Sequence, residues 1–399
     1  MATVRCMESS VEAGRHAALF ARLGTHLGKA VELRRRLHAE PRLSGDEHDT
    51  TMTLLAALDV QVPPLDVGGA VVRIGAADGP AVGLRAEMDA LPVEEQTGVP
   101  WRSTNGAMHA CGHDVHLAAA FAVARTLQPG DGPLPLVLVL QPREETYPSG
   151  GKDVTESAEL ARHDIRAFLG AHVQPRLPAG RFAATPGPVN AASDSLSITV
   201  LGRPGHAAYP HLTADPVVAA ADLIGTLQHL ISRQVDPTNP TVLSIGSIQG
   251  GNSPNVVPAA VRMTGTLRTF DEDDRTRLHG AIGATAEKIS EVHCCESEVT
   301  ITRGAPVLAN DLDLTTSATA WIERTGLVPA PPMRSCGADD FSFYCDKFPS
   351  LMVFVGVGPG GPGQPGLHHP RFLPPDEAVG DVARVMLAAY LGACAETTG

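Results

Sequence analysis

Five short stretches of the sequence hold most of the side chains that could bind a metal ion or move a proton. They supply acids, imidazoles and one thiol, and they are Glu87-Met88-Asp89, the run HACGHD at 109–114, Glu144-Glu145, His172 and His368-His369. Carboxylates, imidazoles and a thiolate are ligands of transition-metal ions. One of two adjacent carboxylates can bind the metal while the other accepts a proton from water. The pattern therefore predicts a transition-metal site with a general base.

These stretches fall where predicted strands end. Runs of apolar residues predict strands over 81–86, 134–140 and 166–172, and a helix is predicted over 114–127 with Asp114 as its N-cap. Strands that alternate with helices indicate an α/β core with a largely parallel sheet. The carboxyl ends of such strands meet at one edge, where ligands bind. The fold would thus bring the five stretches together.

Each stretch taken alone also has a structural explanation. A Glu-Glu pair is often a solvated loop, and Cys111 and His113 could be a small buried residue beside a structural histidine. His172 could be a hydrogen-bonded core histidine, and His368 lies in a Gly/Pro-rich segment that could be a surface loop. The combination of residue types at predicted strand ends is what favours a ligand set.

The middle of the chain predicts a second folding unit. Strands over 195–201, 241–246, 260–269 and 298–303 alternate with helices over 215–233 and 271–292. This βαββαβ order is typical of a two-layer sandwich. Pro- and Gly-rich segments flank it, so we predict a domain at 190–304 inserted into a first domain formed by 1–189 and 305–399. Near the N-terminus, two helices are expected within 13–58, the second starting with a capping box from Ser44 to Glu47.

Composition excludes several classes of protein. The net charge of −13 argues against nucleic-acid binding and against electrostatic docking on anionic membranes. No segment reaches the roughly 18 consecutive apolar residues expected of a membrane span. Seven cysteines without regular spacing indicate free thiols in the cytoplasm rather than a disulfide framework.

The combined motifs resemble one family. The stretches LRAEMDALPVEEQTGVPW, MHACGHDVH, QPREE, GRPGHAAYPHLTADPVVAA, GGNSPNVVPAAVRMTGTLRTF and LHHPRF occur in order within residues 30 to 390. They are similar to the aminoacylase and carboxypeptidase-like metallohydrolases, and in particular to the branch of hippurate hydrolase, N-acyl-amino-acid amidohydrolases and auxin-conjugate hydrolases. The resemblance implies a zinc-exopeptidase-like catalytic α/β domain with an inserted ferredoxin-like α+β lid domain.

The resemblance also implies roles for individual residues. The implied ligands of two divalent metal ions are Cys111, His113, Glu145, His172 and His368. Glu144 falls on the general-base position, and Asp114 and Asp89 would hold ligands in orientation. A thiolate ligand favours Zn²⁺, Co²⁺ or Ni²⁺, although the family also accepts Mn²⁺.

In the lid domain the resemblance implies three substrate-facing residues. His206 would stabilise the oxyanion of the tetrahedral intermediate, and Asn255 and Arg268 would bind polar groups such as the α-carboxylate of the substrate. Structural alternatives are a strand-face salt bridge for Arg268 and a turn position for Asn255.

The implied activity is hydrolysis of the N-acyl amide bond of a small molecule, most simply an N-acyl amino acid. A dipeptidase or carboxypeptidase is the alternative within the same chemistry, and a non-catalytic small-molecule-binding protein is the alternative from another class. The family further suggests a homodimer formed through the lid domain.

The sequence departs from the family pattern at three places. Glu87 stands where aspartate is commoner, which leaves its contacts open. Arg143 and the segment 146–149 replace small and glycine-rich residues, and Arg203-Pro204 replaces flexible ones. One hypothesis is that Arg143 adds a cation that favours an acidic acyl group.

Overall fold

The chain folds into two compact units. The structure, a computed structural model, describes residues 2–358 and 363–397. The first unit comprises residues 1–187, 309–333 and 340–399, and the second comprises residues 188–308 and 334–339.

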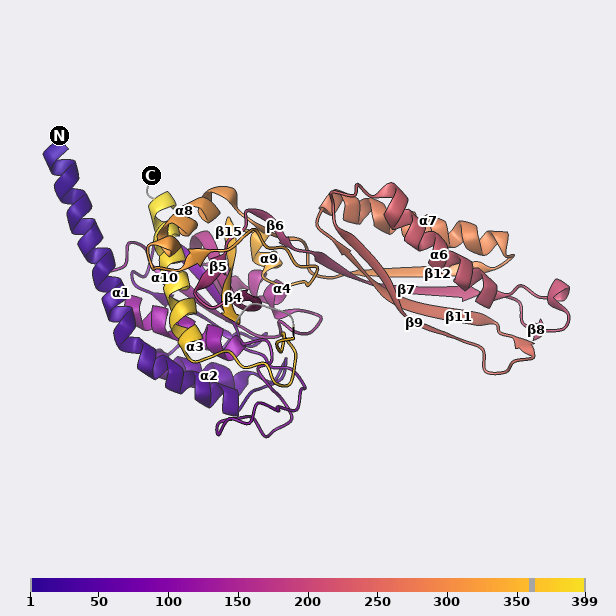
Figure 1. The fold of residues 1–399 in the computed structure, drawn as a ribbon, viewed down its shortest axis with the longest axis horizontal. Helices are drawn as coiled ribbons and strands as arrows, with labels where there is room; N and C mark the ends of the chain where they lie inside the picture. The colour runs from indigo at the N-terminus through magenta and orange to yellow at the C-terminus, as the bar shows by residue number, and fades with distance from the viewer. Residues whose placement is uncertain (1, 359–362, 398–399) are drawn as a thin grey trace. The chain divides into compact units, whose positions relative to one another are not determined.

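The first unit contains the long N-terminal helix and a mixed array of strands and helices (Figure 1). Its helices are α1 (Ala2–Ala39), α2 (His48–Leu58), α3 (His113–Leu127), α4 (Gly150–Thr155), α5 (Ala158–Ala161), α8 (Leu312–Glu323), α9 (Ser342–Cys345) and α10 (Glu377–Thr397). Its strands are β1 (Ala70–Ile74), β2 (Pro80–Glu87), β3 (Leu136–Gln141), β4 (Asp164–Pro178), β5 (Arg181–Ala183), β14 (Val328–Pro329) and β15 (Ser350–Gly358). The short strands β6 (Gly187–Asn190) and β13 (Leu308–Asn310) span the unit boundaries.

These strands form one seven-stranded sheet in the order β1-β3-β2-β4-β15-β5-β14. The central neighbours β3, β2, β4 and β15 run parallel, whereas β1 pairs antiparallel with β3 and β5 pairs antiparallel with β15. This arrangement confirms the predicted α/β class. The central strands are largely buried and mostly apolar because helices cover both faces, although β2 and β3 also bury Arg85, Glu87 and Gln141.

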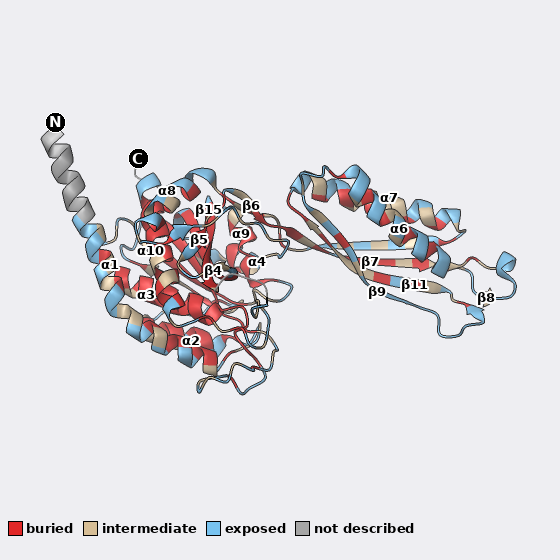
Figure 2. Cartoon of the chain, viewed as in Figure 1, coloured by how far each residue is buried: buried red, intermediate tan, exposed pale blue. Residues whose placement is uncertain are grey.

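Strand β4 shows how the two faces are covered. Phe168 stacks on Tyr344 of α9 with ring centroids 4.3 Å apart, whereas its neighbour Leu169 belongs to the core cluster shared with α3 and α10. Successive side chains point to opposite faces of a strand, so α9 and the α3/α10 layer lie on opposite sides of the sheet. Gly83 of β2 is required here, since a Cβ would lie 2.4 Å from the Phe168 ring. Figure 2 shows the resulting buried sheet between its helices.

Helix α10 contradicts the expectation from the sequence that no segment is long and apolar enough to span a membrane. The window Glu377–Glu396 has a mean hydropathy of 1.4 and meets the length and composition of such a span. In the structure 83% of this window is buried, which is also the behaviour of a core helix packed on α3 and α8. Composition by itself does not separate the two cases.

The predicted capping box at the start of α2 is wrong. The helix begins at His48, and the hydroxyl of Ser44 donates to Asp89 Oδ2 at 2.6 Å instead of capping it. The carboxylate of Glu47 accepts the N–H of Gly45 and the N–H of Arg143, each at 2.8 Å. Contacts with segments distant in sequence therefore replace the local cap.

The second unit is a four-stranded antiparallel sheet with two helices on one side. Its elements are β7 (Ala192–Leu201), β8 (Gly205–His206), the 3-10 helix η1 (Pro210–Leu212), α6 (Pro216–Gln234), β9 (Thr241–Gly250), β10 (Val256–Val257), β11 (Ala260–Thr269), α7 (Glu272–Val292) and β12 (Glu296–Arg303). The sheet order is β12-β7-β11-β9, so the βαββαβ order of the sequence forms a ferredoxin-like sandwich. Leu196 and Ile198 of β7 and Leu223 and Leu227 of α6 lie in its core.

A buried ion pair anchors α7 to this sheet. Asp194 of β7 accepts hydrogen bonds from Arg275 Nη2 and from His279 Nε2, each at 2.6 Å, and Arg275 Nε donates to the same carboxylate at 3.0 Å. Burial opposes ionisation of Asp194, but the bonds from Arg275 and His279 outweigh it and lower the pKa of Asp194 below its usual value.

We expect Asp194→Ala to destabilise the protein by about 3–5 kcal/mol at neutral pH, because it leaves the buried Arg275 charge uncompensated. The carboxylate pKa is lower in the folded state than the ordinary 3.8. Its stabilisation is therefore complete above that value and is lost as the pH falls through the folded pKa. Urea unfolding at pH 7 and at a series of pH values below 4 measures this, with the exposed Asp222→Ala variant as control. An equal difference between wild type and Asp194→Ala at every pH would contradict it.

Candidate functional site

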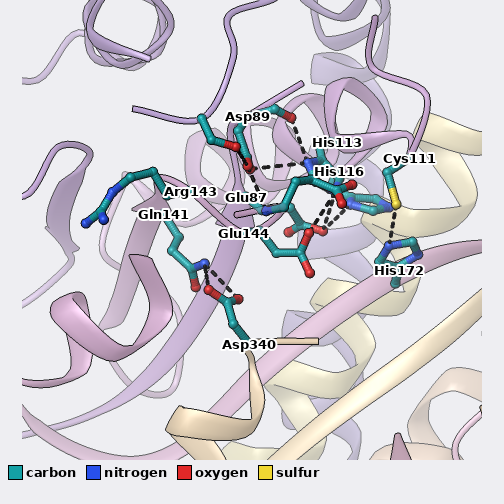
Figure 3. A network of polar contacts seen from close by, with 12 residues as sticks. Glu87, Asp89, Cys111, His113, His116, Gln141, Arg143, Glu144, His172 and Asp340 are labelled. Carbon is teal, nitrogen blue, oxygen red and sulfur yellow. Dashed lines mark hydrogen bonds and ion pairs between the residues drawn. The ribbon is translucent and has the colours of Figure 1, made fainter. Parts of the chain in front are cut away.

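The polar cluster of the first unit lies at the carboxyl ends of β2 and β3 and beside the middle of the parallel strand β4, which continues past His172 to Pro178 (Figure 3). Strand β2 ends at Glu87 and leads into Asp89, β3 ends at Gln141 and leads into Glu144, and β4 carries His172. The loop before α3 adds Cys111 to the same cluster. Strand ends distant in sequence thus meet at one sheet edge, as the sequence predicts.

One ring nitrogen of His113, Nε2, faces this cluster without a hydrogen-bond partner. Its Nδ1 lies 2.8 Å from the carbonyl oxygen of Asp89, and because a carbonyl only accepts, Nδ1 carries the proton. In the neutral ring the lone pair of Nε2 is therefore free, and this buried atom makes no hydrogen bond. The carboxylates of Glu144 and Glu145 lie 3.9 Å away. An imidazole fixed in this tautomer is prepared to bind a metal ion.

His172 is fixed in the same tautomer. Its Nδ1 donates to the carbonyl oxygen of Val173 at 2.7 Å, and its Nε2 lies 3.4 Å from the sulfur of Cys111. The glycine between Cys111 and His113 makes this approach possible. Gly112 has a φ of 84°, and a Cβ there would lie 2.5 Å from Val173. Only glycine fits a left-handed residue in such close contact.

His368 reaches the cluster from the C-terminal segment. Its backbone N–H donates to the carbonyl oxygen of Ala110 at 2.8 Å, which places it beside the Cys111 loop. Its Nε2 lies 3.3 Å from Glu145 Oε1, and this carboxylate raises the pKa of His368.

The donor atoms fall into overlapping groups of three that suit metal ions. Within each group the ligand atoms lie within 4.8 Å of one another, and three such groups are Cys111/His113/His172, Cys111/Glu145/His368 and His113/Glu144/Glu145. Cys111, His113 and Glu145 each belong to two of these groups, which is the arrangement expected of two adjacent ions with common ligands. The free lone pair of His113 and the mixture of sulfur, nitrogen and oxygen donors fit such ions.

The electrostatics of the cluster favour a cation. Burial opposes protonation of His113, but the carboxylates of Glu87, Asp89 and Glu145 outweigh it and raise the pKa of His113 to about 9. Burial and the carboxylates of Glu145 and Glu144 raise the pKa of the Cys111 thiol. Excess negative charge in a buried site holds protons until a metal cation replaces them.

Two acids predicted to orient ligands make different contacts. Asp89 accepts from the hydroxyl of Ser44 and from the N–H of Glu145, the latter at 2.8 Å, while its carbonyl orients His113. Asp89 therefore links a histidine and a carboxylate of the cluster.

Asp114 does not cap α3, contrary to expectation, because the helix starts at His113 and Gly112 takes the N-cap position. The fully buried carboxylate of Asp114 instead binds Arg34 Nε and His38 Nδ1, each at 3.0 Å. These contacts tie the first turn of α3 to α1.

Sequence reasoning missed His116. Its Nε2 accepts the N–H of Val173 at 2.9 Å, so its Nδ1 carries the proton and donates to Glu87 Oε1 at 2.7 Å. Glu87, whose contacts the sequence leaves open, thus acts through His116 on the strand residue next to His172. The signal was available, because His116 follows His113 by three residues and shares its helix face.

The remaining predicted residues lie in the second unit. His206 of β8 is exposed, and its Nδ1 accepts the N–H of Ala208 at 3.1 Å, so Nε2 carries the proton of the neutral ring. Asn255 is adjacent, since its carbonyl accepts the N–H of Ala207 at 3.0 Å. Its side chain accepts from the hydroxyl of Ser253 at 2.7 Å.

Arg268 lies on β11 opposite Ser193 of β7. Among the residues that the structure describes, no acceptor lies within hydrogen-bonding distance of its half-buried guanidinium. Burial lowers the pKa of Arg268. The alternative of a strand-face salt bridge is therefore not formed among the described residues, and this cation is available to an anionic ligand.

Comparison with known proteins matches residues 83–391 to the model of peptidase family M20/M25/M40. The chain is 35% identical over 365 residues to N-acetyl-L-cysteine deacetylase of Bacillus subtilis, which covers 90% of this chain and 86% of that protein. It is 34% identical to N-acetyldiaminopimelate deacetylase of Anoxybacillus flavithermus, over 90% of this chain and 96% of that protein.

The fold is also similar to a crystal structure of the Bacillus subtilis YXEP protein, described as a dinuclear metal-binding peptidase of the M20 family. The TM-score is 0.80 at 29% sequence identity, covering 92% of this chain and 98% of that chain. The sequence match, the fold and the cluster of metal-ligand side chains agree, and the chain belongs to peptidase family M20/M25/M40.

Proposed function

We propose that this protein is a metal-dependent amidohydrolase that cleaves the N-acyl amide bond of a small N-acyl amino acid. The observation that carries the proposal is the cluster in which His113 and His172 turn their Nε2 atoms toward Cys111 and Glu145, with Glu144 beside them. Relatives at 34–35% identity are deacetylases of N-acetylated amino acids, which supports the substrate class.

The proposed ligands of two divalent metal ions are Cys111, His113, Glu145, His172 and His368. Bound ions of this kind activate water and polarise an amide carbonyl. A thiolate in the set favours Zn²⁺, Co²⁺ or Ni²⁺, with Mn²⁺ as a further candidate.

Glu144 is the proposed general base. Its carboxylate lies 3.9 Å from His113 Nε2, so it borders the space that the ligand atoms face. It would accept the proton of the attacking water as a general base. As a general acid, it would then donate that proton to the departing amine nitrogen.

His206, Asn255 and Arg268 are the proposed substrate contacts. The Nε2–H of His206 is a donor suited to the developing oxyanion, and the unpaired guanidinium of Arg268 suits the α-carboxylate of an amino acid.

We further propose a homodimer. His206 and Asn255 lie where β8 pairs with β10, next to the Ala260 end of β11, whereas Arg268 lies near its other end (Figure 1). The separation along β11 is roughly 26 Å at about 3.3 Å per residue, and one acylated amino acid spans only about 10 Å. The two ends of one second unit would therefore serve different active sites, one of them in a second copy.

A complementation experiment tests this dimer. Mixing inactive His206→Ala and Arg268→Ala proteins after mild dissociation should restore about a quarter of wild-type activity, because half of the pairs are mixed and each holds one intact site. The control is His206→Ala mixed with the double variant His206→Ala/Arg268→Ala, which rebuilds no site. Absence of recovery in a mixture shown to contain mixed dimers would reject the shared-site arrangement.

We also propose a cytoplasmic location. In the described part of the chain no disulfide is formed by Cys111, Cys294, Cys295, Cys336, Cys345 and Cys394. Free thiols, and a thiolate in the metal site above all, are suited to a reducing compartment. The ratio of reduced to oxidised thiols in protein isolated under alkylating conditions tests this.

Release of free amine from a substrate panel tests the activity. The panel contains N-acetyl, N-benzoyl and long-chain N-acyl amino acids together with dipeptides, each assayed with Zn²⁺, Co²⁺, Mn²⁺ or Ni²⁺ and with chelator. Chelator-sensitive release from the acyl amino acids is the expected result. Release from dipeptides alone would make the protein a dipeptidase, and silence across the panel with metal bound would reject the proposed substrate class.

A further inference from the structure

Arg143, the residue before the Glu144-Glu145 pair, has an unusual backbone. Its φ is 52°, in the left-handed region that non-glycine residues adopt only when their surroundings hold them there. Such a conformation turns the chain sharply between the end of β3 and Glu144. The contacts that hold it therefore bear on where Glu144 points.

Two backbone hydrogen bonds fix the peptide groups of Arg143. Its N–H donates to Glu47 Oε1 at 2.8 Å, and its carbonyl accepts the N–H of Gly150 at 2.9 Å. The second bond closes the neck of the loop 144–149. The neck is tight, since a Cβ on Gly150 would lie 1.8 Å from the carbonyl oxygen of Pro142.

The guanidinium of Arg143 spans the same loop. Nη2 pairs with Asp153 Oδ2 at 2.5 Å, and Nη1 donates to the carbonyl oxygen of Pro148 at 3.1 Å. Figure 3 shows the side chain pointing away from Glu144 and His113. The positive charge of Arg143 is thus paired with Asp153. This pairing argues against the hypothesis that Arg143 recognises an acidic acyl group.

Glu144 lies between two anchored residues as a result. On one side Arg143 is held by Glu47, Gly150 and Asp153, and on the other the N–H of Glu145 donates to Asp89 Oδ2 at 2.8 Å. The backbone of Glu144 therefore has little freedom to move. The side chains at 146–149 restrict the loop further, because glycines in their place would have greater backbone freedom.

We propose that Arg143 is a positioning residue that, paired with Asp153, holds the loop 144–149 so that Glu144 and Glu145 face the metal-ligand cluster. This inference rests on the proposed function for the role of Glu144. It assigns the Arg143–Asp153 pair to catalysis through loop geometry and not to substrate binding.

A double-mutant cycle of Arg143→Gln and Asp153→Asn tests the pair. Each single variant should lower kcat by about 10-fold or more with KM nearly unchanged, as for residues that orient catalytic groups. The double variant should be no worse than either single one, because both remove the same interaction. Hydrogen exchange of the amides of 144–151 should accelerate in all three, and metal affinity should fall through Glu145.

The charge-swapped variant Arg143→Asp/Asp153→Arg should recover part of kcat and of the slow exchange, since aspartate tolerates the left-handed region. The matched control is Arg162→Gln, whose exposed guanidinium approaches Glu159 at 3.8 Å elsewhere in the same unit and should change nothing.

Unchanged kcat and unchanged exchange in Arg143→Gln would overturn the proposal, as would a rise in KM confined to acidic acyl groups. The exchange and metal-affinity measurements need no turnover. If wild type hydrolyses no amide but Arg143→Gln still loosens 144–151 and weakens metal binding, the proposed function fails while the positioning role stands.

Discussion

Glu144→Gln should keep its metal ions and lose about 10²–10⁴-fold in kcat for N-acyl amino acid hydrolysis, the range expected when a general base is removed. The amide of glutamine preserves the size and one acceptor oxygen of glutamate but accepts no proton at neutral pH. Metal content by elemental analysis and steady-state kinetics on the same preparation measure the two quantities together.

Two other glutamates allow the effect of Glu144→Gln on metal content and on activity to be compared with that of matched variants. Glu145→Gln should lose metal as well as activity, because Glu145 belongs to two of the donor groups and faces His368. Glu94→Gln, at an exposed glutamate of the same unit, should leave both quantities unchanged. Loss of metal from Glu144→Gln would make Glu144 a ligand and would reverse the roles assigned to the two glutamates.

Much of the site was predictable because its position depends on strand ends. The apolar runs before Glu87, before Glu144 and around His172 are long enough to identify β2, β3 and β4, and parallel strands end at one edge. The βαββαβ order likewise predicts the sandwich of the second unit. Strand β15 and helix α10, which complete the first unit, carry no polar motif and were not identified individually.

The errors concern polar side chains that find distant partners. Ser44 and Glu47 read as a capping box, and Asp114 as an N-cap, because local spacing is all that a sequence pattern offers. In the structure Ser44 binds Asp89 and Asp114 binds Arg34, contacts that span 45 and 80 residues of sequence. Tertiary hydrogen bonds took the place of local ones in both cases.

Contacts between residues distant in sequence also explain why the sequence did not predict the roles of Glu87, His116 and Arg143. The role of Glu87 emerges only when β2, α3 and β4 are assembled, because His116 stands between Glu87 and the N–H of Val173. Arg143 was flagged as a departure, but its partner Asp153 lies in α4 across a loop whose path no local pattern predicts. The candidate ligands were expected from the family resemblance, whereas the orientation of their side chains depends on these contacts.

Cys111→Ser should weaken binding of both metal ions by at least about 100-fold, more than changes at residues that only orient ligands. Serine nearly preserves the shape of cysteine, but its hydroxyl is not deprotonated at neutral pH and supplies no thiolate. Because Cys111 belongs to the group with His113 and His172 and to the group with Glu145 and His368, one substitution removes a ligand from both. Competition with a chelator of known affinity, followed by elemental analysis, measures the loss.

The matched control is Cys294→Ser, at an exposed thiol of the second unit, which should bind metal as wild type does. Retention of both ions by Cys111→Ser would remove Cys111 from the ligand set. Loss of a single ion would mean that the sulfur serves only one of its two groups. His113 and Glu145, which also belong to two groups each, would then be the common ligands, and Glu145→Gln rather than Cys111→Ser would be expected to release both ions.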